Sequence, residues 1–312
     1  MPRPGSSPAI VVGVDGSENG LKALAWALEE AGLRGCPVRM IHAFQPTHGR
    51  GRGGRRSPAR SRMEQMYEEG TAVFDAARAR LAEHRHERLL VGTALYEGAP
   101  AQVLIDLVSR ARMCVVGRRG RGGIANLLPG STSMSLGVHA RVPVVIVPAD
   151  WPEARPPSSA PVVVGVDLPL ECETALEFAF EEAQLRGAPL LVVSAWEIVN
   201  PYVYNLRGLQ EAVGERRARV DRMLAETLAP WREKYPQVAV RVVAEQSHPT
   251  ATLVAHSAGA QLLVLGGRAR PRNEIVTGSV TRAVLRRVGC PVAVIHDPVN
   301  ETGGPAVRAG WR

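Results

Sequence analysis

The sequence predicts an α/β protein made of two tandem domains, each with an open parallel sheet covered by helices on both faces. A length of 312 residues suits two domains of ordinary size. Short runs rich in valine and isoleucine alternate with stretches of helical periodicity, which is typical of buried parallel strands joined by crossover helices. The chain also repeats itself, because residues 10–15 (IVVGVD) match residues 162–167 (VVVGVD).

Further matches extend this repeat. Residues 29–37 (EEAGLRGCP) match residues 181–189 (EEAQLRGAP) at the same offset of 152, and Gly130-Ser131 matches Gly278-Ser279 at an offset of 148. Val142-Pro143 matches Cys290-Pro291 at the same offset of 148. Two matches at each offset indicate a duplicated domain of about 140–150 residues. We expect domains at residues 1–149 and 161–298, a proline- and serine-rich linker at 150–160, and a flexible tail at 299–312.

The elements of each repeat follow from periodicity and from helix-ending residues. Gly35-Cys36-Pro37 ends the first helix, and Pro100 suits the first turn of another. In the first repeat we expect strands at 10–14, 38–44, 89–94, 113–116 and 142–147, and helices at 21–33, 63–85, 99–111 and 131–140. In the second we expect strands at 162–166, 190–196, 238–244, 262–265 and 292–295, and helices at 174–185, 213–229, 251–258 and 280–288.

Composition excludes several classes of protein. No apolar run reaches the length of a membrane span, and the N-terminus has no apolar signal region, so we expect a soluble cytoplasmic protein. The cysteines (Cys36, Cys114, Cys172 and Cys290) form no C-x-x-C pair and are expected to be buried free thiols. The histidines show no metal-ligand spacing, and the identity of any metal stays open.

The net charge of +8 comes largely from arginine, and six arginines lie in the segment 49–62 among glycines and serines. Such a composition cannot form a core and predicts a solvated loop. Contact with nucleic acid is the less favoured alternative, because the segment lacks aromatic residues for base stacking.

A candidate ligand site lies where strands end. Ligands of open parallel sheets bind beyond the carboxyl ends of strands, at the point where the strand order reverses. Asp15 ends the first strand, Ala43 lies near the end of the second, and Gly117 opens a glycine-rich segment after the fourth. Glycines let backbone N–H groups face an anion, and the helix opened by Ser131 offers free N–H groups. Together these features describe a mononucleotide site.

The spacing Gly117-x2-Gly120-x9-Gly130-Ser131 resembles the ATP-binding motif of universal stress proteins, G-x2-G-x9-G-[S/T]. The opening VGVDGS (12–17) and the closing VPVVIVP (142–148) are similar to that family too, and the resemblance covers nearly all of residues 8–298. It implies a nucleotide-binding, Rossmann-like fold of the adenine nucleotide alpha hydrolase-like type in each repeat. The implied ligand is ATP, with or without Mg²⁺.

The resemblance also implies site residues. Asp15 would meet the ribose or phosphates, the backbone of Ala43 the adenine, and Val116 and Gly117 the ribose. The full set of implied ATP contacts is Gly13, Val14, Asp15, Ala43, Val116, Gly117, Gly120, Gly130, Ser131, Thr132 and Ser133. Because the family uses its last strand for dimer contacts, residues 142–147 and 292–295 are expected to pair the two repeats. A homodimer of the whole chain and an unknown protein partner are left open.

The second repeat departs from the motif. Ala269 stands where Gly120 does, and only eight residues separate it from Gly278. We therefore expect a weaker site there, or none. The residues that survive as candidates are Asp167, Ala195, Gly266, Gly278, Ser279 and Thr281.

Other interpretations of these residues stay open. Asp15 could cap the first helix, and Ser131 could serve as an N-cap alone. The segment 49–54 (GRGRGG) fits a dinucleotide motif but leads to no immediate helix, and no P-loop motif is present.

For function, the sequence favours an ATP-binding regulator or sensor of the stress response. The alternatives are a nucleotide-free dimerisation scaffold and a slow ATPase, or a protein autophosphorylated at Ser131 or Ser133. No general base is evident beside the phosphate segment, which argues against an efficient enzyme. If ATP binds, the arginines of segment 49–62 are expected to fold partly over it.

Overall fold

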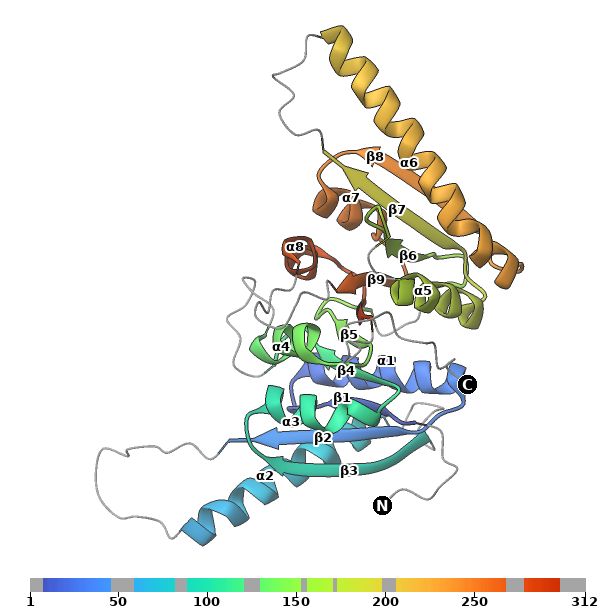
Figure 1. The fold of residues 1–312 in the computed structure, drawn as a ribbon. Coiled ribbons are helices and arrows are strands. Elements are labelled where there is room, and N and C mark those ends of the chain that lie inside the picture. The colour runs from blue at the N-terminus through green and yellow to red at the C-terminus, as the bar shows by residue number, and fades with distance from the viewer. Residues whose placement is uncertain are drawn as a thin grey trace, which may run out of the picture.

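One sheet runs through the molecule and carries helices on both faces (Figure 1). The computed structural model describes residues 8–45, 59–81, 89–120, 130–152, 156–170, 173–197, 206–267 and 278–297. Over these residues the sheet has ten strands in the order β3-β2-β1-β4-β5-β10-β9-β6-β7-β8. The expected α/β class with a parallel sheet in each repeat is confirmed.

The first repeat alternates strands and helices as the sequence predicts. Its elements are β1 (Ile10–Gly13), α1 (Glu18–Arg34), β2 (Val38–Phe44), α2 (Ala59–Leu81), β3 (Leu90–Glu97), α3 (Pro100–Leu107), β4 (Met113–Gly117), α4 (Ser131–His139) and β5 (Val144–Val147). Gly35 ends α1 in the left-handed conformation with φ 59°, which glycine adopts without strain.

The second repeat has the same order. Its elements are β6 (Val162–Gly165), α5 (Glu173–Arg186), β7 (Leu190–Trp196), α6 (Leu206–Lys234), β8 (Val240–Gln246), α7 (Pro249–His256), β9 (Leu262–Gly267), α8 (Ser279–Arg287) and β10 (Val292–His296). The central strands are buried, and residues such as Ile10, Val144, Val162 and Val292 have no exposed surface, whereas Val242 of the edge strand β8 is 39% exposed.

The two last strands join the repeats. β5 and β10 pair antiparallel, with Val145 opposite Ala293, whereas the strand pairs within each repeat are parallel. The pairing of the repeats through their last strands, expected from the family resemblance, is therefore confirmed. Within the first repeat β1 pairs with β2 on one side and with β4 on the other, so the strand order reverses between β1 and β4.

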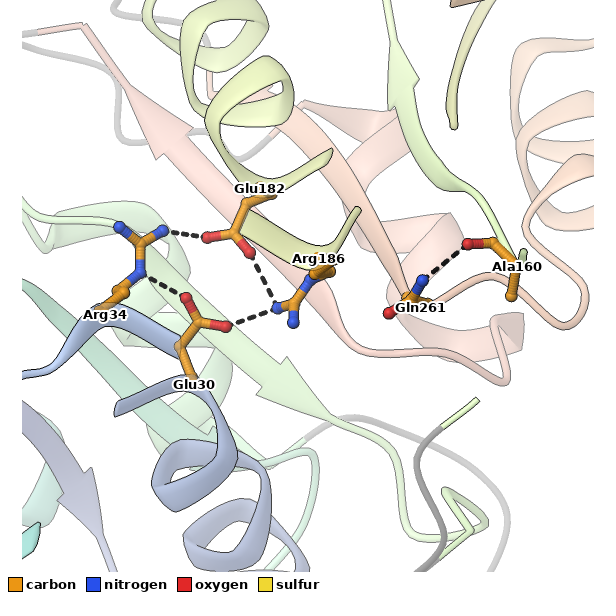
Figure 2. Close-up of polar contacts among 6 residues, drawn as sticks. All are labelled: Glu30, Arg34, Ala160, Glu182, Arg186 and Gln261. Atoms are coloured by element: carbon orange, nitrogen blue, oxygen red, sulfur yellow. Dashed lines mark hydrogen bonds and ion pairs between the residues drawn. The ribbon is translucent and has the colours of Figure 1, made fainter. Parts of the chain in front are cut away.

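A buried ionic cluster joins the repeats on one face of the sheet. Glu30 and Arg34 come from α1, and Glu182 and Arg186 occupy the equivalent positions of α5; we call these four residues the charge box. Figure 2 shows the four side chains pointing toward one another between the two helices. Arg34 bonds both carboxylates, and Arg186 Nη2 lies 2.6 Å from Glu30 Oε2 and 2.8 Å from Glu182 Oε2. Each side chain is at most 7% exposed.

Several expected boundaries were wrong. α2 begins at Ala59, so residues 59–62 of the expected arginine-rich loop are helical, while residues 46–58 lie outside the described residues. α6 runs to Lys234 and contains Pro230, where the sequence predicts the helix to end. Trp231 and Tyr235, beyond that proline, stack on the buried Phe180, and this packing favours continuing the helix. Trp151, inside the expected linker, is buried.

Candidate functional site

The first repeat gathers its predicted site residues around the ends of β1, β2 and β4. Gly13 ends β1 and is followed by Val14 and Asp15, while Val116 and Gly117 end β4, the neighbouring strand. Ala43 lies near the end of β2 on the other side of β1, opposite Tyr96 of β3. His42 beside it is half-buried and contacts Val14 O through Nδ1 at 2.7 Å. These ends form the edge at which open parallel sheets bind ligands.

Asp15 is held in place by the start of α1. Its Oδ1 accepts hydrogen bonds from Ser17 N at 3.0 Å and Ser17 Oγ at 2.6 Å. Ser17 is the N-cap of α1, because its Oγ accepts from Gly20 N at 3.1 Å. The alternative that Asp15 itself caps the helix is therefore wrong: the carboxylate fixes the capping serine instead.

Two glycines of the motif allow the segment after β4 to pass against this turn. A Cβ at Gly117 would lie 2.8 Å from Asn19 O, and a Cβ at Gly120 would overlap Asp15 Oδ2. Both glycines are thus explained by close approach to α1. The approach also brings the Asp15 carboxylate directly beside Gly120.

The two ends of the motif meet at Arg118. Gly130 N donates to Arg118 O at 2.7 Å, and Arg118 N donates to Val147 O at 2.7 Å. Residues 121–129 between them lie outside the described residues. The glycine motif therefore starts and finishes at the same point, next to the reversal of strand order.

Asn19 forms hydrogen bonds near the site that the sequence did not predict. This side chain of α1 is 7% exposed. It donates from Nδ2 to Val147 O at 3.1 Å and accepts from Arg119 N at 2.9 Å through Oδ1. Asn19 thereby joins the end of β5 to the start of the glycine segment, and nothing in its sequence position marks that role.

The start of α4 presents some of the expected phosphate donors but not all. Gly130 is the N-cap residue with φ −63°, so the alternative that Ser131 is the N-cap is wrong. Ser131 is exposed and Thr132 half-exposed in the first turn, whose N–H groups point out of the helix. Ser133 is 2% exposed, and its hydroxyl contacts Arg118 O at 3.1 Å and Gly130 O at 2.9 Å. Its hydroxyl therefore closes the loop and does not face a ligand.

The second repeat has a cavity of about 200 Å³ in the equivalent place. All six of its candidate residues line it, together with apolar side chains of β6, β7, α5 and α7: Asp167, Ala195, Gly266, Gly278, Ser279 and Thr281. Asp167 Oδ1 accepts from Leu168 N at 3.0 Å. Ala269 and the shortened loop lie in residues 268–277, outside the described residues.

Other reactive groups are inert or absent where the structure can be described. Cys36, Cys114 and Cys290 are buried free thiols, as expected, and Cys172 lies outside the described residues. Burial raises the pKa of Cys114 and of Cys290 to about 12, which keeps both thiols protonated. In the described ranges, no three His, Cys, Asp or Glu side chains are grouped to hold a metal ion. No helix in these ranges is long and apolar enough to cross a bilayer.

The fold and the site together define a duplicated, Rossmann-like α/β domain with a glycine-rich segment at the reversal of strand order. The model of the universal stress protein family matches residues 8–148 and again residues 159–296. The chain therefore belongs to the universal stress protein family and carries two tandem copies of its domain.

Known relatives are similar to this chain over nearly its whole length. A universal stress protein of Mycobacterium tuberculosis is 34% identical over 303 residues, covering 94% of this chain and 99% of the relative. One from Mycolicibacterium smegmatis is 33% identical over 293 residues, covering 92% and 96%. The crystal structure of a universal stress protein from Archaeoglobus fulgidus superposes with a TM-score of 0.64 at 19% identity, covering 92% of this chain and 98% of that one. This last likeness concerns the fold alone.

Proposed function

We propose that the first repeat binds ATP and that binding regulates a stress response through a change in shape or in protein partner. The observation that carries the proposal is the meeting of the two ends of the glycine motif at Arg118, beside Asp15 and the first turn of α4. Backbone N–H groups at a helix start are suited to phosphate, and a carboxylate at the end of the first strand is suited to ribose hydroxyls.

The residues present fit such a ligand by the chemistry of their donors. The first turn of α4 and the exposed Ser131 would hold phosphates, Asp15 would meet the ribose, and Ala43 would offer backbone groups to the base. Mg²⁺ bound with ATP would be carried by the triphosphate and by water, since this ion keeps several waters.

Mass spectrometry of nucleotide retained through native purification tests the proposal directly. ATP is the expected molecule, and titration calorimetry should give one tight site per chain. Absence of any adenine nucleotide, together with no heat of ATP binding, would instead support the nucleotide-free scaffold.

A second, weaker site is proposed in the second repeat. The supporting observation is the cavity of about 200 Å³ lined by all six candidate residues. Calorimetry should then resolve a second binding event at higher ATP concentration, and Ser279→Trp should remove it while leaving the tight event unchanged.

Slow autophosphorylation is one of the two enzymatic alternatives, beside slow ATP hydrolysis, and burial of Ser133 argues against that serine as the acceptor. Ser131 is the exposed hydroxyl of the pair. Incubation with γ-labelled ATP should leave the protein unlabelled; label that persists in Ser131→Ala would point to a different acceptor.

A further inference from the structure

The side chain of Arg118 leaves its own repeat. Arg118 is the first residue after β4, and its side chain is 11% exposed. Nη1 donates to Val288 O at 2.8 Å, and Nη2 donates to Asp150 Oδ1 at 3.1 Å. Val288 is the C-cap of α8 in the second repeat. A residue within the glycine motif of one repeat is therefore anchored to the last turn of a helix in the other.

The backbone of the same residue joins the two ends of the phosphate segment. Its carbonyl accepts from Gly130 N at 2.7 Å and from Ser133 Oγ at 3.1 Å, and its N–H bonds β5. Any displacement of Arg118 would therefore move the first turn of α4, where phosphates are proposed to bind. Charged hydrogen bonds to a buried carbonyl are among the stronger polar contacts, so the anchor can resist such movement.

This anchor exists in one direction. Alignment of Gly117-Arg118-Arg119-Gly120 with Gly266-Gly267-Arg268-Ala269 puts Gly267 at the position of Arg118. Gly267 has no side chain, and a Cβ there would overlap the ring of His296. His296 itself contacts Gly137 O of α4 through Nε2 at 2.9 Å. The second repeat therefore contacts α4 through His296, at the end of β10. A contact that starts within the glycine motif itself is made by Arg118, in the repeat that keeps the full motif.

We propose that Arg118 is a positioning residue for the nucleotide site of the first repeat, and that the second repeat holds the first turn of α4 in place through the bond from Arg118 to Val288 O. This inference rests on the proposed ATP binding. Arg118 acts here through Gly130 and Ser133, since its guanidinium is turned to Val288 and Asp150. The degraded repeat thereby gains a role that does not require it to bind nucleotide.

The test compares wild type with Arg118→Ala, Arg118→Lys and the control Asp150→Asn. Asp150 is the exposed partner, with 68% of its side chain accessible, so its loss leaves the bond to Val288. Affinities for ATP and for adenosine are measured at low and high salt. Arg118→Ala should bind ATP at least about tenfold more weakly at both salt concentrations, because lost positioning of α4 is not screened by salt. If Arg118 acted only through its positive charge, the loss would instead vanish at high salt. Adenosine affinity should stay within about twofold of wild type, because adenosine has no phosphates and does not need the first turn of α4.

The ATP affinity of Arg118→Lys should lie between those of wild type and Arg118→Ala, because lysine can still donate one hydrogen bond to Val288 O. Asp150→Asn should match wild type. Equal loss of ATP and adenosine affinity in Arg118→Ala, or no loss of either, would contradict the proposal that Arg118 positions the first turn of α4.

Hydrogen exchange of the ligand-free protein separates this inference from the proposed function. The amides of residues 130–134 should exchange faster in Arg118→Ala and at the wild-type rate in Asp150→Asn. If wild type binds no ATP, the proposed function fails, yet faster exchange still supports the positioning of α4 by Arg118. Unchanged exchange in Arg118→Ala refutes it, whatever the ATP result.

Discussion

Arg186 Nη2 donates to Glu30 Oε2 across the boundary between the repeats, at 2.6 Å and with both side chains buried. Arg34 of the first repeat likewise donates to Glu182 of the second. Each repeat therefore supplies one arginine and one glutamate to the contacts across the boundary. Arg34 also lies over the Phe178 ring and Arg186 over the Trp26 ring, at 5.8 and 5.6 Å from the ring centroids. Two positive and two negative charges thus compensate one another in a site that excludes water.

Replacing one residue of the charge box should lower the free energy of unfolding more than replacing all four. Arg186→Met leaves two carboxylates facing one arginine, and loss of one partner from a buried pair costs about 3–5 kcal/mol. The fourfold variant Glu30→Leu, Arg34→Met, Glu182→Leu, Arg186→Met should lose less, because it leaves no buried charge unpaired. Urea unfolding measures both, and Arg217→Met is the control, since its pair with Asp221 is exposed. A fourfold variant less stable than Arg186→Met would contradict this account.

The stability of the protein should fall as pH rises toward neutrality. Burial raises the pKa of Glu182 to about 7, and the charge of Glu30 adds to the rise, against the lowering effect of Arg186 and Arg34. In the unfolded chain the same group has its ordinary value of 4.5. Between these values the folded state holds a proton that the unfolded state lacks, so stability decreases with rising pH across this window and levels off above it.

Burial also raises the pKa of Glu30, but Arg186 and Arg34 together bring it below the ordinary value, so Glu30 acts only at lower pH. From about pH 5 to about pH 8 we expect the free energy of unfolding to decrease, because the buried Glu182 carboxyl gives up its proton in this range. Urea unfolding at steps of pH measures the slope. Glu182→Gln should flatten it, and an unchanged slope in that variant would assign the effect to other groups.

Substitutions at two glycines of the motif, Gly120 and Gly130, should separate effects on folding from effects on binding. Gly120→Ala pushes against Asp15 Oδ2, so it should lower the unfolding free energy by about 1–2 kcal/mol. A Cβ at Gly130 would lie 3.4 Å from Arg118 O, and its φ of −63° suits alanine. Gly130→Ala should therefore keep the stability of wild type yet weaken ATP binding by about tenfold or more, because the Cβ crowds the start of α4. Thermal unfolding and ATP titration of both variants check this; normal ATP affinity of Gly130→Ala would place the phosphates elsewhere.

Periodicity and repetition were enough to predict the order of strands and helices along the chain, because this order depends on local patterns and on the duplication. The pairing of β5 with β10 was expected from the family resemblance and not from the sequence pattern. The charge box was missed, since Glu30 and Arg34 at i and i+4 have the spacing of an ordinary surface pair. Only the meeting of α1 with α5 buries them. α6 continues through Pro230 for a similar reason, as its support comes from Phe180, far away in the sequence. At the site, the glycine spacing located the ends of the loop, but long-range contacts of Asn19 and Arg118 have no local signal.

Asn19 should matter to both stability and binding. It is buried, and its amide joins Val147 O to Arg119 N. Asn19→Ala leaves both backbone groups without that partner, which should cost about 1–3 kcal/mol of unfolding free energy. Asn19→Asp keeps the shape and the acceptor for Arg119 N, but it loses the donor to Val147 O and adds a negative charge near the proposed phosphates.

We therefore expect Asn19→Asp to weaken ATP binding more than Asn19→Ala, and the difference between them to shrink at high salt because the added charge is screened. The matched control is Gln102→Ala, which removes an exposed amide that donates a hydrogen bond to Asp106 within α3. Calorimetric titration at low and high salt and urea unfolding supply the comparison. Should Asn19→Asp bind ATP as tightly as wild type at low salt, the phosphates would lie away from the turn that Asn19 holds, and the site would have to be moved along the sheet edge toward β2.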